Sequence, residues 1–236
     1  FIKSKRPKIK VITKINGGEN KGNIRDQLLI SLESLNSTSI YGYMIHNYHS
    51  FLDHPEVWEK LTKLRSEKLV QKIGFSLYYP EELQSLWEKE IYPDIVQVPY
   101  NIFDRRFEAL FPQIQEKKCE IHVRSTFAAG LVFRKSVTEN EYADMFSLIE
   151  MLNQISNKYD ISIESLCINF ALQNQYIDQI ILGVETKENI KSNLLSVDQY
   201  IQVKDVIKKL DVFKIKDISF LLPTDENYKN YSLLKK

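Results

Sequence analysis

Short runs of β-branched and apolar residues alternate with longer amphipathic stretches along most of the chain, and this alternation limits the possible fold more than any other feature. The first run covers residues 9–15, and in the stretch that follows Ile24, Leu28 and Leu32 recur at helical spacing. Strands that alternate with helices are typical of parallel βαβ units with right-handed crossovers, whose sheets are covered on both faces. The sequence therefore predicts an α/β fold around a parallel sheet.

The same alternation continues to about residue 194. Strands are expected at 9–15, 40–46, 72–77, 95–100, 120–125 and 179–184. Helices are expected at 23–35, from Pro55 past Leu64, and at 80–89, about 104–117, 139–159, 163–173 and 187–194. So many units of regular length favour a TIM-type (β/α) barrel in a single domain, although six strands are two fewer than such a barrel has.

Composition excludes several classes of protein. The 32 basic and 31 acidic residues leave a net charge of +1, so no global field favours nucleic acid or an anionic membrane as a partner. No segment approaches the roughly 20 apolar residues of a membrane span, and the first residues lack the apolar core of a signal peptide. We therefore expect a cytoplasmic protein, with Cys119 and Cys167 as reduced core thiols.

Polar side chains stand at the ends of four expected strands, where a buried parallel strand would otherwise be apolar. They are Lys14, His46, Ser76 and Gln97. The carboxyl ends of parallel strands meet at one edge of a sheet, which in barrels carries the active site. These four residues are therefore the first candidates for function.

Several segments, taken in order, resemble the aldo-keto reductase superfamily, and most closely its bacterial reductases. They are residues 43–46 (YMIH), 72–76 (KIGFS), 94–101 (DIVQVPYN) with 104–106 (DRR), and 181–184 (ILGV) with Asn193. The resemblance implies a TIM (β/α)8-type barrel that uses NADP or NAD as its cofactor. In its reduced form, NADPH or NADH, the cofactor would reduce a small aldehyde, ketone or sugar-type carbonyl. Lys14 and His46 match the family's catalytic lysine and histidine, which respectively lower the pKa of a tyrosine proton donor and orient the substrate carbonyl.

The resemblance also assigns residues to the cofactor. Ser76 and Gln97 match the side chains that hold the nicotinamide carboxamide, but Leu77 stands where an asparagine is common. Arg124 replaces a tyrosine that often lies under the nicotinamide ring, and Ser125 is expected at the pyrophosphate. At the adenosine end the expected residues are Gly183, Lys187 and Asn193, while Glu185 weakens the expectation of a 2′-phosphate.

The family's aspartate and tyrosine precede the lysine strand, and neither is found here. We therefore expect a barrel domain over 1–236 whose first two strands are missing from this sequence, with a C-terminal tail from about 217 to 236. A barrel without its proton donor would be inactive as given. A catalytically silent nucleotide-binding or regulatory module is the alternative, favoured by Leu77 and Arg124.

Other chemistries find weaker support. His46, His49, Asp53 and His54 lie close in sequence, but their spacing does not place the histidines on one helix face, so no metal is expected. The glycine-rich segment 17–22 lacks the ending of a phosphate loop, and no G-x-S-x-G elbow is present. His122 is interpreted as a core histidine, and the basic residues between Lys3 and Lys10 as a solvated segment rather than a nucleic-acid site.

Overall fold

The computed structural model describes residues 9–15, 23–133 and 143–215. Its six strands form one sheet in the order of the chain: β1 (Ile12–Ile15), β2 (Ile40–Ile45), β3 (Val70–Ser76), β4 (Ile95–Pro99), β5 (Glu120–Arg124) and β6 (Gln179–Ile180). The pairings of β1 with β2, β2 with β3 and β3 with β4 are parallel, as the alternation predicts. The expected tail, the segment 17–22 and Lys3, Lys5, Arg6 and Lys8 lie outside the described residues.

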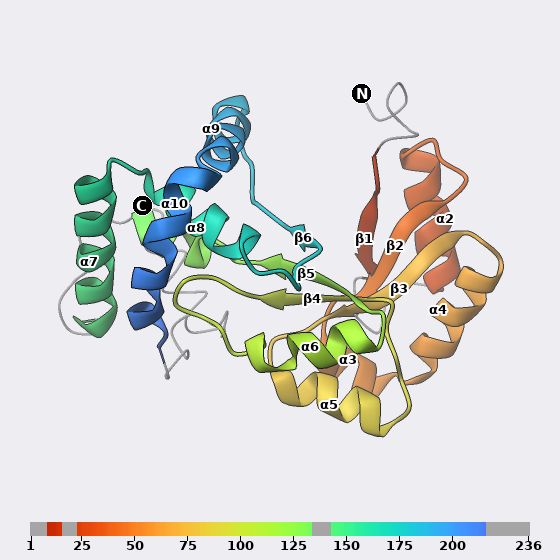
Figure 1. Ribbon diagram of the computed structural model, residues 1–236. Helices are drawn as coiled ribbons and strands as arrows, with labels where there is room; N and C mark the ends of the chain where they lie inside the picture. Colours follow the sequence, from red (N-terminus) through yellow and green to blue (C-terminus); the bar gives the residue numbers. More distant parts are fainter. Residues whose placement is uncertain (1–8, 16–22, 134–142, 216–236) are drawn as a thin grey trace. The chain divides into compact units, whose positions relative to one another are not determined.

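The chain divides into two compact units, which are described separately. The first comprises residues up to 98 together with 110–122, and the second comprises 99–109 and the residues from 123 onward. In the first unit, α2 (Ile24–Ser34) and α4 (Glu56–Ser66) lie side by side along β2 and β3 (Figure 1). The same unit holds α3 (Tyr48–Asp53), α5 (Pro80–Glu88) and α6 (Phe111–Glu116).

The core of the first unit lies between these helices and the sheet. Leu28 of α2, Leu61 of α4 and Phe75 of β3 are fully buried, as the helical and strand periodicities predict. Burial of one such side chain stabilises the fold by about 1.5–3 kcal/mol. This packing supports the strands of the first unit, whose carboxyl ends carry the candidate site.

Asparagine side chains begin two of the helices in this unit. Asn23 accepts a hydrogen bond from the backbone N–H of Arg25, and Asn47 accepts from His49 and Ser50. The second cap starts α3, a helix that the sequence pattern did not predict. The next helix, expected to begin at Pro55, begins one residue later at Glu56. Pro55 is its N-cap residue, and no side-chain hydrogen bond caps α4.

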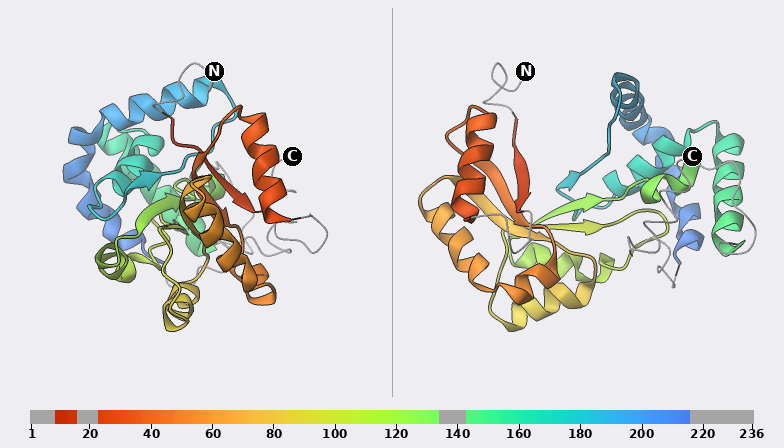
Figure 2. Two further views of the ribbon diagram at one scale, coloured as in Figure 1. Left: turned by 90° about the vertical axis from the view of Figure 1, so that its right-hand side faces the viewer. Right: turned by 180° about the vertical axis from the view of Figure 1, so that it is seen from behind.

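The second unit is mainly helical beyond β5 and β6. Figure 2 shows α8 (Ile163–Leu172), α9 (Lys187–Asp198) and α10 (Tyr200–Ile207) packed together, and α7 (Ala143–Tyr159) also contacts α8. Three 3-10 helices are described in the chain: η2 (Glu108–Leu110), η3 (Ala128–Phe133) and η4 (Lys208–Phe213). The fully buried Leu166 of α8 and Val203 of α10 belong to the core of this unit.

Several boundaries differ from expectation. The first strand begins at Ile12 rather than at residue 9. The helix expected from about 104 begins as α6 at Phe111, because Pro112 is tolerated only in the first turn of a helix. The last strand ends at Ile180 rather than 184, and residues 181, 183 and 184 are exposed. The α10 helix was not predicted, and α9 runs four residues beyond its expected end.

No helix among the described residues is long and apolar enough to cross a membrane. Both cysteines are buried free thiols, which confirms the interpretation of Cys119 and Cys167 as reduced core residues.

Candidate functional site

Three of the predicted site residues meet at the carboxyl ends of strands in the first unit. The Nζ atom of Lys14 donates to Oε1 of Gln97 at 2.6 Å and to Oγ of Ser76 at 3.4 Å. Ser76 is 1% exposed and Gln97 is 6% exposed. Two nearly buried neutral polar side chains and one ammonium therefore form a small polar centre at this edge of the sheet.

Strand register explains how residues so distant in sequence converge. Lys14 pairs with Met44, Met44 pairs with Gly74, and two residues further along β3 Ser76 pairs with Gln97. The backbone N–H of Leu77 then donates to the carbonyl of Gln97 at 2.9 Å, which extends the pairing past the end of β3. Parallel pairing thus holds the polar centre by main-chain hydrogen bonds on both sides of β3.

His46 lies one residue past the end of β2 and is exposed. Because β1 and β2 are parallel and Ile15 pairs with Ile45, His46 follows its strand at the same end of the sheet as Lys14. The start of α3, capped by Asn47, fixes the chain directly after it. The structure therefore places both predicted catalytic residues at the carboxyl ends of neighbouring strands.

Arg124 and Ser125 form a second group, in the second unit. Nη1 of Arg124 donates to Oγ of Ser125 at 3.3 Å. Ser125, Ala128 and Ala129 all have positive φ values, of 61°, 47° and 56°, which is costly for residues other than glycine. Such strain is concentrated at functional sites, and the next residue, Gly130, is also left-handed.

Sequence reasoning gave no role to Asn101, which holds this loop. Its Nδ2 donates to the carbonyl of Ser125 at 2.9 Å, and its Oδ1 accepts from the backbone of Phe103 and Asp104. Asn101 is 2% exposed. Asn101 belongs to the segment 94–101 that resembles the family. Its contact with a backbone carbonyl 24 residues away cannot be predicted from the spacing of residues in the sequence.

The loop also contains an unsatisfied polar atom. Thr126 is 2% exposed, and its Oγ1 is one of three buried side-chain polar atoms in the described part of the chain that have no hydrogen-bond partner. A buried hydroxyl without a partner is destabilising unless something satisfies it. A ligand oxygen that accepted a hydrogen bond from the Thr126 hydroxyl would satisfy it. The loop after β5 is therefore a candidate ligand-binding segment.

The residues expected at the adenosine end lie before and within α9. Gly183 is exposed, and a Cβ there would meet no atom within 4 Å. Lys187 is the exposed first residue of α9, and Asn193 is half-buried on the same helix. Asn189 closes a capping box with Thr186 and accepts from the backbone of Glu185, so its role is to start the helix.

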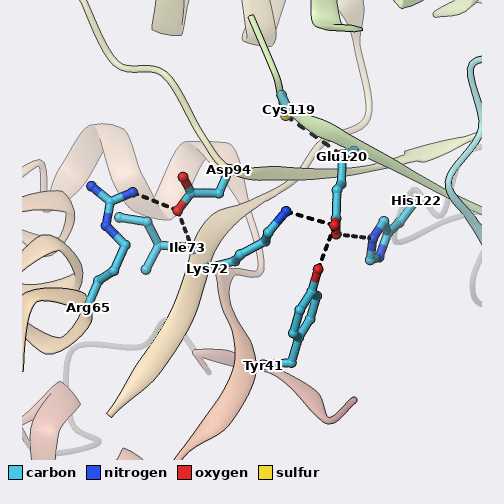
Figure 3. Close-up of polar contacts among 8 residues, drawn as sticks. All are labelled: Tyr41, Arg65, Lys72, Ile73, Asp94, Cys119, Glu120 and His122. Carbon is cyan, nitrogen blue, oxygen red and sulfur yellow. Dashed lines mark hydrogen bonds and ion pairs between the residues drawn. The ribbon is translucent and has the colours of Figure 1, made fainter. Parts of the chain in front are cut away.

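A separate polar cluster lies at the opposite, amino-terminal ends of the strands. Figure 3 shows Tyr41, Lys72 and His122 converging on the carboxylate of Glu120, at 2.5, 2.7 and 3.0 Å. Burial alone would raise the pKa of Glu120, but hydrogen bonds from these three side chains and the charge of Lys72 outweigh it and lower the pKa. His122 is 2% exposed, which confirms its interpretation as a bonded core histidine.

Among the described residues, no group of three or more histidine, cysteine, aspartate or glutamate side chains is arranged to hold a metal ion. The histidines near α3 thus supply no described metal centre. The chemistry that the arrangement offers comes from one ammonium, one imidazole and a pair of neutral hydrogen-bonding groups at the strand ends. Such a set suits proton transfer and the binding of a planar amide.

Comparison with known proteins adds independent findings. A model of the Aldo/keto reductase family matches residues 1–214. The uncharacterized oxidoreductase YqkF of Bacillus subtilis (strain 168) is 22% identical over 210 residues, which cover 84% of this chain and 68% of that protein. The NADH-specific methylglyoxal reductase of Escherichia coli (strain K12) is 24% identical over 196 residues, which cover 74% of this chain and 59% of that protein. The alignments thus span about two thirds of the length of these relatives.

Solved structures agree with the family match. The holo form of the aldo-keto reductase AKR11C1 from Bacillus halodurans superimposes with a TM-score of 0.72 at 22% identity, covering 92% of this chain and 77% of that one. An aldo/keto reductase from Klebsiella pneumoniae in complex with NADP and acetate gives a TM-score of 0.67 at 17% identity, covering 92% and 74%. These likenesses confirm the predicted barrel fold. The family model matches most of the length of the chain, and this match shows that the chain belongs to the aldo/keto reductase family.

Proposed function

We propose that the protein is an NAD(P)H-dependent oxidoreductase that reduces the carbonyl group of a small aldehyde, ketone or sugar-type substrate. The contact of Lys14 with Ser76 and Gln97, at the strand ends of a chain from this family, is the observation that carries the proposal. An ammonium beside two nearly buried side chains that can bind an amide suits reduction by a nicotinamide.

Taken separately, each of the two units holds residues that fit one part of a nicotinamide dinucleotide. Ser76 and Gln97 together offer donors and acceptors, which a carboxamide needs on both its oxygen and its nitrogen. The unsatisfied hydroxyl of Thr126, beside Arg124 and Ser125, suits the oxygens of a pyrophosphate. The carboxylate of Glu185 favours the free ribose 2′-hydroxyl of NAD, whereas the ammonium of Lys187 favours the 2′-phosphate of NADP. Both cofactors are therefore candidates. One relative is NADH-specific by name and another was solved with NADP.

When bound, the reduced cofactor supplies a hydride, and the protein's own residues manage the proton and the orientation. The ammonium of Lys14 stabilises the anionic form of an acid placed against it, and so lowers the pKa of a proton donor. His46, at the end of β2, is the candidate for donating an imidazole N–H to the substrate oxygen. The relative from Escherichia coli is named for methylglyoxal, a small dicarbonyl, which supports a small carbonyl as substrate here. We place this activity in the cytoplasm, without a nucleic-acid or membrane partner.

The test is oxidation of NADH or NADPH by the full-length protein, which is expected to supply the tyrosine proton donor, with a panel of small aldehydes, ketones and sugar-type carbonyls. We expect Lys14→Met and His46→Ala to reduce turnover by about 100-fold or more. Lys63→Met, at an exposed position of α4, is the matched control and should retain the wild-type rate. Full turnover in both site variants would refute the assigned roles.

A silent nucleotide-binding module is the second candidate. Leu77, which is fully buried, adds no polar group beside Ser76, and Arg124 takes the place of the tyrosine expected from the family resemblance. This candidate predicts dinucleotide binding with no oxidation of NAD(P)H by any carbonyl. Measuring binding and turnover on the same sample separates the two functions.

A further inference from the structure

We propose that Lys14 is also the positioning residue for Gln97, so that dinucleotide affinity depends on Lys14 independently of the chemical step. This inference rests on the proposed function, because it assigns Lys14 a second role in the same site. It predicts that removing the ammonium weakens binding as well as catalysis. A lysine that served only proton transfer would leave binding unchanged.

The contact between Lys14 and Gln97 has a fixed polarity. An ammonium has three donors and no acceptor, so the amide atom 2.6 Å from Nζ of Lys14 must be the oxygen of Gln97. Oε1 therefore turns toward Lys14, and Nε2 becomes the end that is directed away from the ammonium. The ammonium of Lys14 thus determines the orientation of the Gln97 side-chain amide.

In the described part of the chain, Lys14 is the one group that forms a hydrogen bond with the side-chain amide of Gln97. Pairing of β3 with β4 fixes the main chain of Gln97, through Ser76 and the N–H of Leu77. The terminal torsion of a glutamine is broad and roughly two-fold, so main-chain pairing leaves the amide orientation open. A hydrogen bond to a charged group is worth enough to favour one orientation by about 10-fold or more.

Lys14 also contacts the side chain next to Gln97. It donates to Oγ of Ser76 at 3.4 Å, which occupies an acceptor site on that hydroxyl and favours pointing its hydrogen elsewhere. Leu77 is apolar and fully buried, so the amide-binding pair consists of Ser76 and Gln97 without a third polar side chain from the next position. Lys14 therefore pre-organises both members of the pair.

The experiment measures dissociation constants for NADH and NADPH by quenching of tryptophan fluorescence, with no substrate present. Wild type is compared with Lys14→Met, Gln97→Ala, the double variant and Lys14→Arg, with Lys63→Met as the control. We expect Lys14→Met and Gln97→Ala each to weaken binding by about 10-fold, and the double variant to be no weaker than Gln97→Ala alone. Lys14→Arg, which keeps a cationic donor, should restore affinity to within about 3-fold of wild type.

Each outcome decides a different question. Wild-type affinity in Lys14→Met, or additive losses in the double variant, would overturn the positioning role and leave the proposed function standing. A wild-type protein that binds neither dinucleotide would overturn the proposed function and this inference with it. If Lys14→Met does not fold, as judged by circular dichroism, Gln97→Glu replaces it. That variant keeps the acceptor for Lys14 but loses the Nε2 donor, so retained affinity in Gln97→Glu would contradict the inference.

Discussion

Gly74 has no room for a side chain, because an ideal Cβ there would lie 1.9 Å from the carbonyl oxygen of Ile95. We predict that Gly74→Ala lowers the free energy of unfolding by about 3 kcal/mol or more, since only movement of the β4 backbone could relieve this clash. Gly183→Ala is the matched control, because no atom lies within 4 Å of its Cβ position, and its stability should equal that of wild type. Urea denaturation of both variants measures the difference, and equal midpoints would contradict the close approach of β3 and β4.

Asn101 permits a second prediction for a single residue. Its side chain makes three hydrogen bonds while almost fully buried, and one of them holds the carbonyl of the left-handed Ser125. We expect Asn101→Ala to lower stability by about 2 kcal/mol, because the partners lose their hydrogen bonds inside the protein. If the loop after β5 binds a pyrophosphate, the same variant also weakens dinucleotide affinity. A thermal melt that matches wild type would rule out the role assigned to Asn101.

The secondary-structure elements show where sequence patterns suffice and where they do not. Strands β2 to β5 were predicted to within two residues because short β-branched runs between turn signals are a local feature. Pro112 indicates a helix start near Phe111. The residues before it were predicted as helix because no local pattern shows the contacts that form their loop. Asn101 accepts from the backbone of Phe103, and Arg105 donates to Asp211, 106 residues away. Lys14, Ser76 and Gln97 were found for the same local reason, since strand ends can be read from sequence. Their mutual contact depends on register and side-chain length across 62 and 83 residues, which no pattern encodes.

The α3 helix provides a prediction for an element. Asn47 caps it by accepting from the backbone N–H groups of His49 and Ser50, directly after His46. We predict that Asn47→Ala costs about 1 kcal/mol of stability, whereas Asn47→Asp costs much less because it keeps the cap. Since α3 has only six residues, its loss should be visible as faster amide hydrogen exchange at 48–53. Unchanged exchange in Asn47→Ala would show that packing of Tyr48 and Phe51, rather than the cap, maintains the helix.

The polar cluster around Glu120 connects strands β2, β3 and β5, and it makes the stability of the whole molecule depend on pH. The pKa of Glu120 is lowered in the folded protein, so its contribution is present above the unfolded value of about 4.5 and is lost as pH falls through the folded pKa. For Lys72, burial would lower the pKa, but the hydrogen bond and charge of Glu120 raise it above 10.5. The contribution of Lys72 is therefore present below about pH 10.5 and is lost as pH rises through its folded pKa.

The lowered pKa of Glu120 and the raised pKa of Lys72 predict that the free energy of unfolding is highest between acid and strongly alkaline pH. Glu120 contributes to its decrease on the acid side. Each carboxylate that must take up one proton on unfolding adds a slope of about 1.4 kcal/mol per pH unit. Glu120→Gln should reduce this acid slope, while lowering stability at neutral pH by about 1–2 kcal/mol because Lys72 loses its charged partner. Glu59→Gln, at an exposed position on α4, should leave the slope at its wild-type value. Urea denaturation of the three proteins from about pH 3 to 7 measures both quantities. If Glu120→Gln retains the full acid slope, the protons are taken up elsewhere, and the cluster in Figure 3 is not a source of the acid sensitivity.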